Sequence, residues 1–105
     1  MQRPEYVDYL LDVLSDMGHA TSKRLFSGWD IRIDGEMVGA FLNDTLYLRV
    51  DEELRAELEG MGCRPFTYTT KRGSVTVGRF VTAPDSCADD NDELLDWVRR
   101  VRQHL

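Results

Sequence analysis

The chain has 105 residues, of which 42% are hydrophobic, 10% aromatic and 30% charged. This is the size and mix of a single compact domain, and we expect residues 1–105 to form one. Asp and Glu number 19 against 13 Lys and Arg, for a formal net charge of −6. Because nucleic-acid and anionic membrane surfaces attract basic proteins, this balance argues against a stand-alone DNA or RNA binder and against membrane binding.

The first segment predicts an amphipathic helix. Pro4 suits a first helical position, and Gly18 suits the residue after the last turn. Between them, apolar residues recur at steps of three and four, with acidic residues on the opposite side. The apolar stripe is Val7, Leu10, Leu11, Leu14 and Met17, and the acidic side is Glu5, Asp8, Asp12 and Asp16.

From Lys23 onward the pattern alternates, with turn signals at Asp34-Gly35 and Asn43-Asp44. We predict three strands, over residues 24–34 with an irregularity at Ser27-Gly28, 36–42 and 45–50. In the third strand Leu46, Leu48 and Val50 share one face, whereas Tyr47 and Arg49 share the other.

The second half predicts a helix, a hairpin and a final helix. Asp51 suits an N-cap, Leu54 and Leu58 point inward, and residues 60–62 end that helix. Residues 66–69 and 75–81 flank a turn at 71–74, and a polar loop follows from Ala83. The last helix begins near Asn91 or Asp92 and buries Leu94, Leu95, Val98 and Val101. The order α-β-β-β-α-β-β-α predicts an α+β fold, an antiparallel sheet with helices packed on it.

The sequence predicts no catalytic, metal or cofactor site. His19 and His104 lack metal-ligand spacing with the cysteines, and there is neither a dinucleotide-binding nor a phosphate-binding glycine loop. No apolar run is long enough to span a bilayer, and Asp8 and Asp12 interrupt any signal-peptide core. We therefore expect a cytoplasmic, non-enzymatic protein, in which Cys63 and Cys87 are reduced thiols.

Two segments are candidate interaction surfaces. In residues 21–29, Lys23 and Arg24 accompany Phe26 and Trp29, although large aromatics are normally buried, which favours a core role for Phe26 and Trp29. The second candidate is Lys71 and Arg72 at a hairpin tip, where ordinary solubilising charge is the alternative. The predicted surface residues are Lys23, Arg24, Trp29, Lys71 and Arg72.

Five segments, in order along nearly the whole chain, resemble the N-terminal domain of the TfoX/Sxy family. They are residues 21–28, 33–37, 46–51, 65–68 and 94–97. The resemblance implies a small bacterial α+β domain, related to secretion-chaperone-like folds, from proteins that regulate natural competence. It implies no catalytic residues. Where the family tends to have Phe-Gly-Gly, this chain has Phe26-Ser27-Gly28.

The two-domain relatives carry a further helix-rich domain and act as co-activators beside the cyclic-AMP receptor protein, and we expect this chain to lack that domain. Our leading hypothesis is a transcriptional accessory domain that works through a protein partner. One alternative is direct nucleic-acid binding, which requires the basic residues at 23, 24, 49, 71, 72 and 79 to share a face. Another is a chaperone-like homodimer that holds a client.

Overall fold

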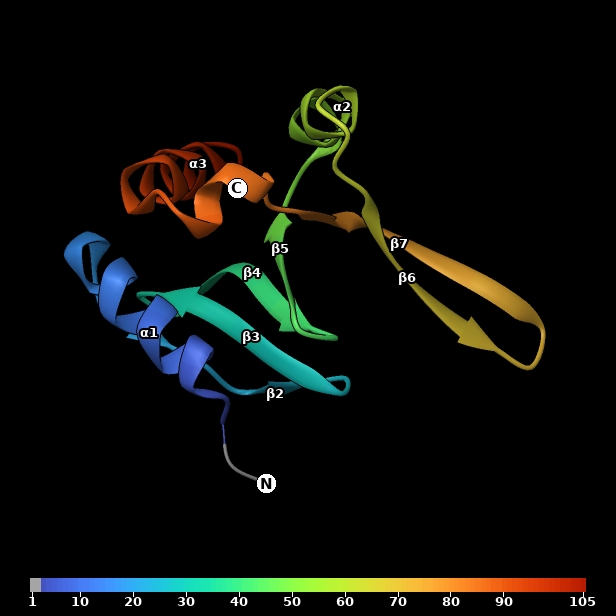
Figure 1. The fold of residues 1–105 in the computed structure, drawn as a ribbon, viewed down its shortest axis with the longest axis horizontal. Coiled ribbons are helices and arrows are strands. Elements are labelled where there is room, and N and C mark those ends of the chain that lie inside the picture. Colours follow the sequence, from blue (N-terminus) through green and yellow to red (C-terminus); the bar gives the residue numbers. More distant parts are fainter. Residues whose placement is uncertain (1–2) are drawn as a thin grey trace.

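The structure, a computed structural model, describes residues 3–105, which form three α-helices and a seven-stranded antiparallel sheet (Figure 1). The strands are ordered β1-β3-β4-β5-β7-β6, and β2 also pairs with β3. This confirms the predicted α+β class. The elements are α1 (Glu5–Leu14), β1 (Ala20–Thr21), β2 (Arg24–Leu25), β3 (Gly28–Ile33), β4 (Glu36–Leu42), β5 (Thr45–Arg49), α2 (Glu52–Gly60), β6 (Pro65–Thr70), β7 (Gly73–Thr82) and α3 (Asn91–Gln103), with short 3-10 helices at Ser15–Met17 and Asp85–Ala88.

The main hydrophobic core lies between the three helices and one face of the sheet. Each helix contributes its apolar stripe, and the sheet contributes the side chains that alternate toward it. The core residues include Val7, Leu10 and Leu14 of α1, Leu54 and Leu58 of α2, Leu94, Val98 and Val101 of α3, and Ile31, Ile33 and Leu48 of the sheet. The opposite sheet face has no helix over it (Figure 1).

The start of α2 agrees with the predicted cap. The Asp51 carboxylate accepts a hydrogen bond from the Leu54 amide at 2.9 Å and thereby caps α2. Asp90 caps α3 in the same way, through the Glu93 amide at 3.1 Å. Pro4 is the N-cap of α1 rather than its first residue, one position from the prediction.

The predicted strand over residues 24–34 is wrong, because the chain reverses within it. Arg24 pairs with Trp29 and Leu25 with Gly28, so Phe26 and Ser27 form a two-residue turn between β2 and β3. Phe26 has a φ of +54°, in the left-handed region that large side chains rarely adopt. Phenylalanine does not indicate such a turn in a sequence. The alternating pattern of residues therefore predicted a strand that continues through residues 26 and 27.

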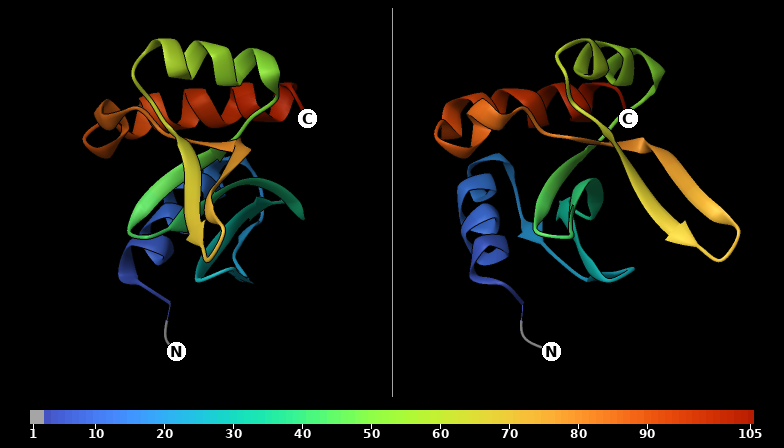
Figure 2. Two further views of the ribbon diagram at one scale, coloured as in Figure 1. Left: turned by 90° about the vertical axis from the view of Figure 1, so that its right-hand side faces the viewer. Right: turned by 45° about the vertical axis from the view of Figure 1, so that its right-hand side comes forward.

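Strand β7 bends between its two partners. Consecutive β6 residues, Pro65 and Phe66, pair with Val81 and Val77, so residues 78–80 have no partner in β6. An interruption of this kind turns a strand and increases its twist. The β6–β7 hairpin consequently extends away from the helices and beyond the rest of the sheet (Figure 2).

The close pairing of β4 with β5 depends on the absence of a side chain at Gly39. A Cβ atom there would lie 2.4 Å from the Tyr47 carbonyl oxygen, which belongs to the backbone and cannot move without shifting β5. We predict that Gly39→Ala lowers the free energy of unfolding by roughly 1–3 kcal/mol, the usual cost of overpacking. Denaturant unfolding measures this change.

Gly60→Ala is the matched control, because a Cβ at this last residue of α2 would meet nothing within 4 Å. It should leave the stability unchanged or raise it by up to about 1 kcal/mol, since alanine favours helix over glycine. Equal effects of the two substitutions would contradict the close-approach argument.

Candidate interaction surface

Lys23, Arg24 and Trp29 lie together at the β2–β3 hairpin, a reversal that the sequence pattern did not predict. Lys23 and Arg24 are exposed, whereas Trp29 is half-buried and packs against the main core. The Arg24 guanidinium lies over the indole, 5.3 Å from the ring centroid, a cation–π arrangement. The core role expected for Trp29 is thus correct in part, with Arg24 covering its outer side.

A buried carboxylate, which sequence reasoning missed, positions this patch. Asp30 is 2% exposed, and its two oxygens accept hydrogen bonds from the Lys23 amide and from Arg32 Nε, each at 2.7 Å. The Asp30 amide donates to the Lys23 carbonyl at 2.8 Å, and Ser22 Oγ donates to the Asp30 carbonyl at 2.6 Å. Residues 22 and 23 therefore follow a path set by Asp30.

We predict that Asp30→Ala destabilises the fold by roughly 1–3 kcal/mol, because the Lys23 amide and the Arg32 guanidinium both lose their acceptor. Thermal and denaturant unfolding measure the loss. Asp16→Ala, at an exposed position, is the control and should change stability by less than about 0.5 kcal/mol. A wild-type stability for Asp30→Ala would show that Asp30 does not hold the patch.

Lys71 and Arg72 form the two-residue turn of the β6–β7 hairpin and are both exposed. Thr70 Oγ1 accepts from the Arg72 amide at 3.2 Å and donates to the Gly73 carbonyl at 3.1 Å, which holds the turn. In the strand order this hairpin lies at the opposite edge of the sheet from β2. The two predicted patches therefore lie at opposite edges of the sheet, with β4 and β5 between them.

The surface between the two patches is apolar. Side chains from β2, β4, β5, β6 and β7 gather on the helix-free side of the sheet around a second cluster of buried residues. Sequence alternation had already assigned Tyr47 to the side opposite Leu46 and Leu48, but not the partners that it meets there. We call this surface the aromatic face, and it comprises Leu25, Phe26, Met37, Ala40, Leu42, Tyr47, Phe66, Tyr68, Val77 and Phe80.

Phe26 closes the aromatic face from its far edge. Its ring stacks on Phe66 of β6 with centroids 6.2 Å apart, although β2 and β6 lie at opposite edges of the sheet. The expectation that Phe26 enters the core is wrong, because 60% of its surface is exposed. An exposed aromatic residue in left-handed backbone is costly to the fold, and such outliers concentrate at functional sites.

A groove of about 150 Å³ lies on the aromatic face, between the β2–β3 turn and the strands β4, β5 and β7. Two arginines line it. Arg49 donates to the Met37 carbonyl at 3.4 Å, and the Arg79 guanidinium lies 5.9 Å from the centre of the Phe80 ring. The lining residues are Leu25, Phe26, Met37, Arg49, Arg79 and Phe80.

The described arginines differ in whether a carboxylate pairs with them. Those on and beside the helices are ion-paired, for example Arg100 with Glu57 through two 2.6 Å hydrogen bonds and Arg102 with Asp34 and Glu36 at 3.8 and 3.7 Å. Among residues 3–105, Arg49 and Arg79 form no ion pair. Neither guanidinium therefore has a directly paired carboxylate within these residues.

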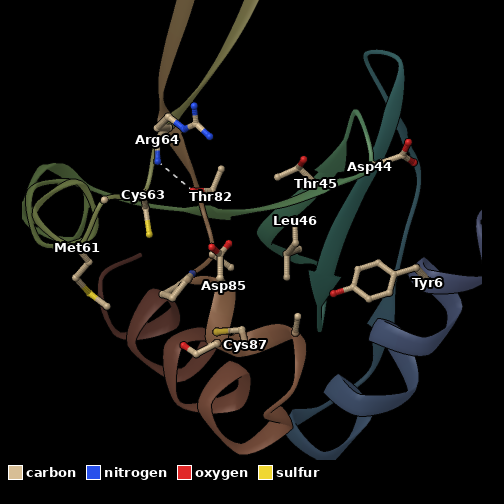
Figure 3. Close-up of a pocket in the computed structure, with 15 residues that line it drawn as sticks. Tyr6, Asp44, Thr45, Leu46, Met61, Cys63, Arg64, Thr82, Asp85 and Cys87 are labelled. Carbon is tan, nitrogen blue, oxygen red and sulfur yellow. Dashed lines mark hydrogen bonds between the residues drawn. The ribbon is translucent and has the colours of Figure 1, made fainter.

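The cysteines line a different hollow, a pocket of about 820 Å³ (Figure 3). Cys63 comes from the α2–β6 connection and Cys87 from the short helix before α3, and both are free thiols. Burial raises the pKa of Cys63, and burial with the Glu93 carboxylate raises the pKa of Cys87 to about 12. Burial also raises the pKa of Tyr6 on the pocket wall. Raised values keep these groups protonated, the opposite of an activated nucleophile.

We predict that both thiols alkylate slowly in the folded protein at pH 7.5, at least tenfold more slowly than in urea, because a raised pKa leaves little thiolate. The rate should increase as pH rises, and half-buried Cys63 should react before buried Cys87. Iodoacetamide labelling followed by mass spectrometry measures both rates. Fast labelling of folded Cys87 at neutral pH would restore a catalytic thiol to consideration.

Within residues 3–105 no cluster of three or more His, Cys, Asp or Glu side chains is placed to hold a metal ion. No helix in that range combines the length and apolarity needed to cross a membrane.

A sequence model of the TfoX N-terminal domain matches residues 12–105. The match includes every strand of the sheet, α2, α3 and the whole aromatic face, whereas residues 5–11 of α1 precede it. A search of curated proteins found no match.

Proposed function

Because this chain belongs to the TfoX N-terminal domain family, which is associated with competence regulation and is not known to be catalytic, we propose that it is a regulatory domain acting through a protein partner. The partner binds the aromatic face. We further propose a cytoplasmic location, the compartment in which bacterial transcription is regulated.

The aromatic face is the observation that carries this proposal. On it, Phe26, Tyr68 and the neighbouring Val75 expose 60%, 42% and 38% of their surfaces, close to the buried rings of Phe66 and Phe80. Contiguous exposed apolar surface on a folded protein typically marks an interaction site. Aromatic residues at the centre and arginines at the side are the composition of a protein–protein interface rather than of a solvated sheet.

The five residues predicted from sequence flank this face at two sheet edges. Lys23 and Arg24 lie beside it at the β2 edge, where Arg24 covers the Trp29 ring on the helix side of the sheet. Lys71 and Arg72 extend it at the tip of the β6–β7 hairpin. We propose that these cations contact the rim of the partner, where charge contributes more to association rate than to affinity.

Phe26→Asn separates binding from folding. Asparagine tolerates the left-handed backbone, which relieves roughly 1–2 kcal/mol of strain and offsets the loss of the Phe66 contact, worth about 0.5–1.5 kcal/mol. We expect an unchanged thermal midpoint and loss of the bound partner. Affinity capture of the tagged chain from its native host, with nuclease added and quantitative mass spectrometry, measures binding.

Met61→Asn is the control, since Met61 is a similarly exposed apolar residue, at 56%, outside the aromatic face. It should retain the partner. Retention of every nuclease-resistant partner by Phe26→Asn would reject the aromatic face as the interface. Charge reversal at Lys23 and Arg24, or at Lys71 and Arg72, should weaken capture without lowering the thermal midpoint.

Direct nucleic-acid binding is the second candidate, and Arg49 and Arg79 favour it, since neither forms an ion pair in the part of the chain that the structure describes. In this case captured material would disappear with nuclease, and the purified chain would bind duplex DNA with an affinity that falls steeply with salt. The net charge of −6 favours the protein partner.

A further inference from the structure

We infer that the groove on the aromatic face recognises a short acidic segment of the partner, which inserts one large apolar side chain beside Phe26 and places carboxylates against Arg49 and Arg79. This inference rests on the proposed function and adds the chemistry of the partner. The family match assigns no role to Arg49 or Arg79, and neither arginine is among the surface residues predicted from the sequence.

The size of the groove favours a single side chain. Its volume is about 150 Å³, below the range of roughly 300–1,000 Å³ that encloses a whole small molecule. Leu25, Phe26, Met37 and Phe80 supply apolar walls. Burying a Leu, Met or Phe side chain of a partner segment against these apolar residues is favourable.

The two arginines of the groove favour carboxylates next to the inserted apolar side chain of the partner. Guanidinium groups bind carboxylates through paired hydrogen bonds, and Arg49 and Arg79 have no carboxylate of their own among residues 3–105. Their existing contacts, with the Met37 carbonyl and the Phe80 ring, leave further guanidinium donors for a ligand.

Two carboxylates that adjoin these arginines have other partners. Glu36 and Asp51 line an adjoining hollow together with Arg49 and Arg79. Glu36 pairs with Arg102, and Asp51 accepts from the Leu54 amide and lies 2.7 Å from His104 Nδ1. The positive charge of the groove is consequently available to an incoming acidic group.

Panning of a phage library of random twelve-residue peptides against the full 105-residue chain tests the inference. We expect enriched peptides to carry Asp or Glu next to Leu, Met or Phe. The best peptide, synthesised with a fluorophore, should bind Arg49→Gln/Arg79→Gln at least tenfold more weakly in fluorescence anisotropy, as the loss of charged hydrogen bonds implies. Raising the salt concentration should weaken binding to the wild-type chain.

Two further variants keep the outcome interpretable. Arg64→Gln removes another exposed arginine, outside the groove, that forms no ion pair within residues 3–105, and this variant should bind the peptide normally. Arg49→Lys/Arg79→Lys keeps the charge and should recover part of the affinity, which also checks against a folding defect in the double Gln variant.

Enrichment of peptides without acidic residues, absence of any enrichment, or unchanged affinity of the double Gln variant would overturn the inference. The proposed function fails separately. If Phe26→Asn loses the native partner while the double Gln variant retains it, the aromatic face is the interface and the acidic segment is wrong. If duplex DNA displaces the peptide from the arginines, nucleic acid is the ligand.

Discussion

The bend of β7 at residues 78–80 is the constraint on which the rest of the surface depends. Before the bend β7 pairs with β6 alone, and from Phe80 onward it pairs with β5, with only Pro65 of β6 still opposite Val81. The Arg55 side chain of α2 lies over the bend, because a Cβ at Gly78 would be 2.0 Å from Arg55 Nη1 and would displace that flexible side chain. The same curvature lets Phe26, from the far edge of the sheet, reach Phe66.

The two faces of the sheet use side chains differently. On the helix side, aliphatic residues fill the core and arginines are matched by carboxylates, as Arg100 with Glu57 shows. On the other side the aromatic residues form only a small cluster, and Arg49 and Arg79 lack carboxylate partners within residues 3–105. A net charge of −6 therefore does not describe the surroundings of these two arginines, and docking responds to the local field.

Local patterns predicted the elements well and the site in part. Apolar spacing located the three helices, and Asp51 marked one start correctly, because caps and amphipathic stripes are properties of short segments. The turn at Phe26 was missed because a bulky residue in left-handed backbone contradicts local preference. Asp30 and the Phe26–Phe66 contact could not be predicted, since each depends on residues that only the folded sheet brings together.

The β6–β7 hairpin has a thermodynamic consequence of its own. All residues from 67 to 76 are exposed, so this hairpin has backbone hydrogen bonds but buries little side-chain area. Segments of this kind open locally at a lower free energy than the core. A partner that covers the β6–β7 hairpin suppresses those openings. The hairpin then loses conformational entropy, and this loss makes the free energy of binding less favourable. The affinity for the partner therefore depends on the stiffness of the β6–β7 hairpin as well as on the groups that contact the partner.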